Sequence, residues 1–112
     1  MIVTSSSTVA GHRIVKTLGL VTGNTVRARH MGKDILAVLK NVVGGEIEEY
    51  TKLLAESRQQ SLDRMAAQAK VLGANAVVDA RFGTSYIMGA AAEILAYGTA
   101  VLLEEQKPHG GP

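Results

Sequence analysis

One stretch of the sequence, from Glu46 to Leu72, constrains the fold more than any other. On a helical wheel with 3.6 residues per turn it separates into two faces. One face carries apolar and small polar side chains: Tyr50, Leu53, Leu54, Ser57, Ser61, Met65 and Leu72. The other carries charged and amide side chains: Lys52, Glu56, Gln59, Asp63 and Lys70. This period predicts an amphipathic helix, because a strand alternates every two residues.

The ends and the length of this helix are also informative. Glu46, Glu48 and Glu49 place negative charge at the start, Lys70 lies in the last turn, and Gly73 can close the helix in a left-handed conformation. At ~1.5 Å per residue the helix is roughly 40 Å long. A compact domain of this size has a radius of gyration near ~13 Å. We therefore expect the helix to lie along a second copy of the chain.

The strands and a second helix follow from shorter patterns. Gly19 predicts either a bulge in its strand or a close approach of another backbone, and Thr22-Gly23-Asn24 predicts a turn. Residues 25–29 either extend the preceding strand or form a short one. The remaining elements are a short strand Met1–Thr4, a strand His12–Val21, a short amphipathic helix Lys33–Val43, a strand Ala76–Phe82, a loop Gly83–Gly89 and a strand Glu93–Leu103.

These elements define an α+β fold. A mainly antiparallel sheet packs against a short and a long helix in the order β-β-α-α-β-β. We expect a single domain over residues 1–106 and a flexible tail over 107–112. The strand Glu93–Leu103 is mostly apolar on both faces, so we expect a second copy of the chain to cover one of them.

Composition excludes several classes of protein. The chain has 112 residues and contains no cysteine, which excludes a disulfide framework and a thiolate metal cage and fits a cytoplasmic location. The net charge of +2 predicts no broad attraction to nucleic acid or to a membrane surface. No apolar run is long enough for a membrane span, and the first residues do not form a signal peptide.

An ordered set of short motifs resembles the YbjQ-like family of small uncharacterised prokaryotic proteins, which carries a heavy-metal-binding label. The matching residues are Gly19–Gly23 (GLVTG), Asp34, Val43–Gly45, Tyr50, Leu54, Arg58, Leu72–Val78 (LGANAVV) and Tyr97–Val101 (YGTAV). The resemblance implies an α+β domain that assembles into a homopentamer and that binds a metal ion or a small ligand.

Candidate metal ligands are His12 and His30, with His109 in the tail. Zinc and copper sites usually take two ligands from one rigid element, for instance His-x3-His, and no such pair is present. The histidines are therefore either surface residues or, in a ring of copies, ligands gathered around its axis.

Three other residues are candidate ligand contacts. Tyr50 and Arg58 lie two steps of four apart on the long helix, which places Arg58 at the flank of the apolar face. Arg58 forms a structural ion pair, with Asp34 as the candidate partner, or lays its aliphatic stem on the core with its charged head in water. The functional alternative is an anion or ligand contact in a crevice between subunits. Asp79 lies on the same strand face as Arg81, two residues further on. Asp79 forms either a cross-strand or intersubunit pair, or supplies, with Glu93, oxygen ligands to a cation.

No nucleophile, general base or cofactor loop stands out, so we do not expect an enzyme. We expect a homo-oligomeric module that binds a metal or metalloid ion or a small ligand. The alternative is a structural or partner-docking homo-oligomer without a ligand.

Overall fold

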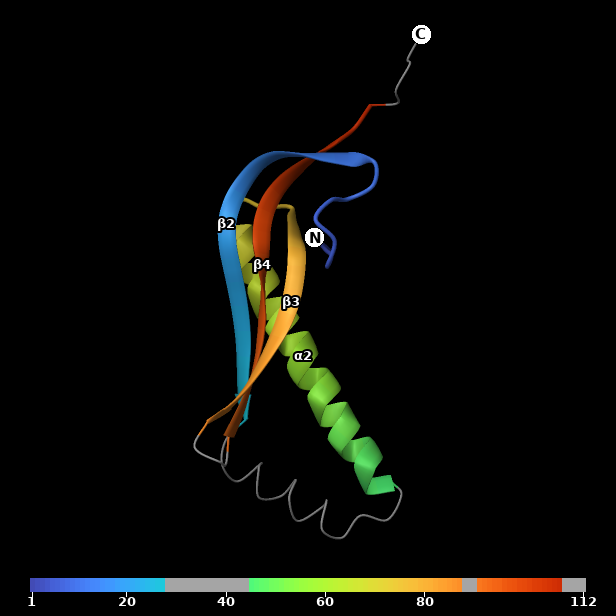
Figure 1. Cartoon of the computed structure of the whole chain (residues 1–112), viewed down its shortest axis with the longest axis vertical. Helices are drawn as coiled ribbons and strands as arrows, with labels where there is room; N and C mark the ends of the chain where they lie inside the picture. The colour runs from blue at the N-terminus through green and yellow to red at the C-terminus, as the bar shows by residue number, and fades with distance from the viewer. Residues whose placement is uncertain (28–44, 88–90, 108–112) are drawn as a thin grey trace.

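The computed structural model describes residues 1–27, 45–87 and 91–107 (Figure 1). In these ranges the chain forms helix α2 (Gly45–Val71) and the strands β1 (Ile2–Val3), β2 (His12–Arg27), β3 (Ala76–Ile87) and β4 (Ala91–Glu105). The strand order across the sheet is β1-β3-β4-β2. β1 is parallel to β3, and the other neighbours are antiparallel. The predicted α+β class is confirmed, with a mixed sheet.

Helix α2 spans 27 residues, one position earlier than predicted at each end. Gly73 ends it with φ +89°, and its N–H donates to the carbonyl of Lys70 at 2.9 Å. Leu72 follows the helix and is 45% exposed, so its predicted place on the buried face is wrong. The described residues contain this one helix. The predicted short helix Lys33–Val43 lies outside them. The described residues therefore do not test the predicted succession of two helices between the strands.

Two predicted interruptions of the strands are wrong. β2 continues through Gly23 to Arg27, where a turn was expected. A Cβ at Gly23 would overlap the backbone of Ser61 and Met65. The absence of a side chain at this position therefore allows α2 to approach the strand closely. β3 continues through the expected loop at Gly83 as far as Ile87. The predicted bulge at Gly19 is confirmed by a register shift and a φ of +123°.

Helix α2 packs on one face of the sheet, mainly against β2 and β4 (Figure 1). The core between them is built from small and medium-sized residues: Val21, Met65, Ala69, Ala74, Val77, Ala96 and Ala100. Three buried hydroxyl groups extend it. The Oγ atom of Ser61 lies 3.0 Å from Oγ1 of Thr25 and 2.9 Å from the carbonyl oxygen of Ile94. The hydroxyl of Thr25 donates to the backbone carbonyl of Ser57 at 3.2 Å, and the hydroxyl of Ser57 donates to the carbonyl of Leu53 at 2.9 Å. These partners satisfy hydroxyl groups that would be costly to bury alone.

A second cluster lies on the opposite face of the sheet. Val9 packs against the buried residues Ala76, Val78, Val101 and Leu103. The side chain of Asn75 closes the end of this cluster. It donates to the backbone carbonyl of Leu103 at 2.9 Å and accepts from the Leu103 N–H at 2.7 Å. One side chain thus makes the two hydrogen bonds that a residue on a neighbouring strand would make with Leu103.

The close approach at Gly23 generates a stability prediction. We expect Gly23→Ala to lower the free energy of unfolding by ~1–3 kcal/mol, because the added methyl group must displace helix backbone. Gly83→Ala is the matched control, since a Cβ there meets its nearest atom, on Tyr97, at 4.0 Å. Urea unfolding at one protein concentration measures both variants. Equal stability of the two variants would contradict the inferred contact.

Candidate functional site

The N-terminal loop binds a bulge in β3. The register between β3 and β4 shifts between Val78 and Arg81, and Asp79 within this bulge has a φ of +53°. The N–H of Asp79 donates to the carbonyl of Ser6 at 3.0 Å, and the hydroxyl of Ser7 donates to the Asp79 carboxylate at 2.8 Å. Asp and Asn tolerate this left-handed conformation better than most residues. The Asp79 side chain therefore both fits the strained backbone and holds the loop.

Arg81 reinforces the same contact. One guanidinium nitrogen donates to the carbonyl of Ser5 at 2.7 Å and to that of Ala80 at 3.0 Å. Arginine carries five N–H donors, and the remaining ones make no hydrogen bond within the described residues. Arg81 is exposed and lies directly opposite Tyr97 on β4. Its free donors are available to a carboxylate or another anion at this face.

Below this contact, the side of the sheet opposite α2 carries no described element. We call it the open face. Residues directly opposite each other in antiparallel strands share a face, so the register assigns it Leu20, Thr22, Asn24, Val26, Arg81, Glu93, Leu95, Tyr97 and Thr99.

The open face combines apolar side chains with two opposite charges. Leu20 is 71% exposed, Val26 49% and Tyr97 37%. Arg81 supplies the positive charge and lies directly opposite Tyr97 on β4. Glu93 supplies the negative charge, and its carboxylate accepts a hydrogen bond from the side-chain amide of Asn24 at 2.9 Å. Exposed apolar groups of this size beside complementary charges are typical of a protein-binding surface.

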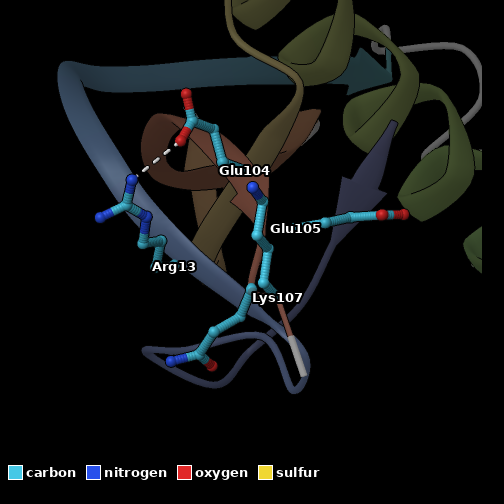
Figure 2. Close-up of a pocket in the computed structure, with 5 residues that line it drawn as sticks. Arg13, Glu104, Glu105 and Lys107 are labelled. Atoms are coloured by element: carbon cyan, nitrogen blue, oxygen red, sulfur yellow. Dashed lines mark hydrogen bonds and ion pairs between the residues drawn. The ribbon is translucent and has the colours of Figure 1, made fainter. Parts of the chain in front are cut away.

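A hollow of about 370 Å³ lies at the other end of the molecule, where β2 begins and β4 ends (Figure 2). Arg13 and Glu104 form an ion pair across it at 3.1 Å, with side chains 65% and 56% exposed. Glu105 extends away from this pair in Figure 2, whereas the Lys107 side chain runs toward Glu104. An ion pair this exposed contributes little to stability. The hollow offers a ligand only solvent-facing charges, and Arg13 and Glu104 already pair with each other.

The structure places the predicted ligand contacts apart. Arg58 is exposed and makes no ion pair within the described residues, while its predicted partner Asp34 lies outside them. The side chain of Tyr50 also lies outside the described part of the chain. Asp79 contacts the N-terminal loop, and Glu93 lies opposite Ser85, six residues further along β3 and so roughly 20 Å away. A single chain therefore does not bring Asp79 and Glu93 together.

The predicted metal ligands are likewise not gathered. His12 lies at the start of β2, where its Nδ1 atom is 3.0 Å from the carbonyl oxygen of Ala10. His30 and His109 lie outside the described residues. Within residues 1–27, 45–87 and 91–107, no three His, Asp or Glu side chains come together as a metal site. No helix in this part of the chain is long and apolar enough to cross a membrane.

Comparison with known proteins places the chain in a family. A family model described as "Putative heavy-metal-binding" matches residues 1–104. A UPF0145 protein of Dehalococcoides mccartyi is 59% identical over 104 residues, which are 93% of this chain and 100% of that protein. A UPF0145 protein of Archaeoglobus fulgidus is 59% identical over 103 residues, which are 92% of this chain and 95% of that one. The chain belongs to the YbjQ-like family, and the predicted resemblance is confirmed.

A solved structure shares the fold. It is the crystal structure of a Pediococcus pentosaceus protein of unknown function that belongs to the DUF74 family. It superimposes with a TM-score of 0.61 at 16% identity and covers 93% of this chain and 98% of that one.

Sequence reasoning missed the roles of Ser5–Ser7 and of Asn75. The serines read as a polar turn, and nothing local links them to a strand that begins some seventy residues later. A signal was present for Asn75, because a lone Asn between the helix-closing Gly73 and an apolar strand can pair with backbone.

The left-handed backbone of Asp79 can be tested directly. We expect Asp79→Ala to lower the free energy of unfolding by ~1–3 kcal/mol, since it loses the Ser7 hydrogen bond and strains the backbone. Asp79→Asn keeps an acceptor oxygen and tolerates the same φ, so we expect less than ~0.5 kcal/mol. Urea unfolding of both variants at equal protein concentration gives the difference. Equal losses in the two variants would contradict this role.

Proposed function

We propose that the protein is a homo-oligomeric binding module in which a second copy covers the open face. The accessible surface of the single chain carries this proposal. It is 7579 Å², whereas a monomeric globular protein of 11.8 kDa exposes about 5,900 Å². The excess is comparable with the roughly 1,600 Å² that a standard protein–protein interface buries in total.

The shape of the chain supports the same proposal. Its radius of gyration is 18.4 Å and its extents are 67 × 27 × 16 Å. A compact domain of this length has a radius of gyration of about 13 Å. In Figure 1, α2 crosses the sheet obliquely and its first turns extend away from the strands. A chain this extended leaves both its helix and its sheet underpacked, which neighbouring copies would correct.

The open face supplies the chemistry for such a contact. Burying one large apolar side chain contributes about 1.5–3 kcal/mol, and association itself costs about 4–15 kcal/mol. Burying Leu20, Val26 and Tyr97 therefore offsets the cost of association only if they form the centre of a larger interface. Arg81 and Glu93 would give the interface its orientation, because each offers a charge that a second copy can complement.

The number of copies and the ligand belong to this proposal. The family resemblance implies a pentamer, and the family description suggests a heavy-metal ion. An ion or small ligand would then bind where copies meet, where His12, His30, Tyr50, Arg58 and Asp79 are the candidate contacts. The absence of cysteine supports a cytoplasmic location for the assembly.

The same surface could also serve a purely structural role. An oligomer without a ligand, or one that docks another protein, needs the same apolar face. We place it second, because the family description points to ligand binding. No reaction enters the proposal.

Light scattering tests the assembly. We expect a mass that is a multiple of 11.8 kDa at micromolar concentration, and we expect Leu20→Asp to shift it toward the monomer by placing a charge in an apolar interface. Val71→Asp is the matched control, because Val71 is 87% exposed and lies on α2, away from the open face. The assembled species is then titrated with divalent metal ions by calorimetry. A monomeric parent would overturn the assembly, and an oligomer without heat of binding would leave the structural alternative.

A further inference from the structure

The outer edge of β2 is bonded to side chains of α2. β2 ends the sheet formed by the described residues, so one of its edges has no neighbouring strand among them. The N–H of Thr22 donates to Oε1 of Gln68 at 2.6 Å, and Nη1 of Arg64 donates to the carbonyl of Asn24 at 2.5 Å. We call Arg64 and Gln68 the edge cap.

The edge cap depends on similar distances between its residues along the helix and between the groups that they bind along the strand. Arg64 and Gln68 are four residues apart, which is a rise of about 6 Å along a helix. Thr22 and Asn24 are two residues apart, which is about 6.7 Å along a strand. The glycine between them brings the helix close enough, because any Cβ at Gly23 would overlap helix backbone.

The two capped groups are the ones that a second β2 would need. In an antiparallel pair, two opposite residues exchange both of their N–H···O bonds. If the β2 strands of two copies paired about a two-fold axis at Gly23, Thr22 of one copy would face Asn24 of the other. The Thr22 N–H and the Asn24 carbonyl would then bond to each other across the axis. Both are already bonded to the edge cap.

The strand would otherwise be a strong template for such pairing. β2 is 16 residues long, and it exposes 71% of Leu20 and 49% of Val26 on either side of the capped pair. Long exposed edges with apolar side chains add strands from other chains, and charged groups at the edge oppose this. Arg64 places such a charge at the middle of the edge.

We propose that the edge cap closes the β2 edge to strand addition by a second copy, so that this edge takes no part in assembly. Arg64 and Gln68 are its determinants, and Gly23 allows them to reach the edge. This inference does not rest on the proposed function, because it applies to a monomer and to an oligomer alike.

The double variant Arg64→Ala/Gln68→Ala tests the inference. We expect its mean mass by light scattering to rise at least twofold above that of the parent at equal concentration, with an infrared signal for intermolecular sheet. Gln60→Ala/Lys70→Ala is the matched control, since these side chains of α2 are exposed and make no hydrogen bond within the described residues. We expect the control to keep the mass of the parent.

A conservative variant separates capping from stability. Arg64→Lys/Gln68→Glu keeps a donor for Asn24 and an acceptor for Thr22, and we expect the parent mass. If circular dichroism finds the double alanine variant unfolded, Gln68→Ala alone decides, with an expected increase in mass over Gln60→Ala. A variant without the edge cap that is folded and keeps the mass of the parent would overturn the inference. So would a conservative variant that associates as strongly as the double alanine variant.

Discussion

The close contact between α2 and β2 at Gly23 is the constraint on which the rest of the structure depends. No side chain separates the strand from the helix backbone at this point. The neighbouring positions carry small groups, and Ser61 and Thr25 satisfy each other in the buried layer. This contact fixes which face of the sheet the helix covers. It also brings the edge cap within reach of the β2 edge.

Because α2 covers one face, the other must be covered by something else. The N-terminal loop covers its upper part and is held by the bulge at Asp79 and by Arg81. The open face below has no described cover, and there the exposed apolar residues Leu20 and Val26 gather. With the edge of β2 capped, the open face is the surface that we propose a second copy covers. The proposed assembly thus follows from how the helix divides the sheet.

The sequence predicted what depends on local pattern. The period of α2, its end at Gly73 and the bulge at Gly19 follow from neighbouring residues and agree with the structure. The predicted turn at Gly23 was wrong. In the sequence, a glycine that allows a distant helix to approach a strand cannot be distinguished from a glycine in a turn. The role of Asp79 could not be predicted either, since it depends on a serine loop 72 residues away in the sequence. Among the candidate site residues, Asp79 contacts the N-terminal loop and His12 contacts the carbonyl of Ala10, and no local pattern predicted either contact.

Amide hydrogen exchange measured by NMR tests the contact between α2 and β2 most directly. Leu20, Thr22 and Val26 all direct their N–H groups to the outer edge of β2, because alternate residues of a strand face the same edge. Only the Thr22 N–H reaches an acceptor on α2. We expect the Thr22 amide to exchange at least about tenfold more slowly than those of Leu20 and Val26. Equal exchange at the three amides would mean that α2 does not hold this edge, and it would contradict the contact at Gly23.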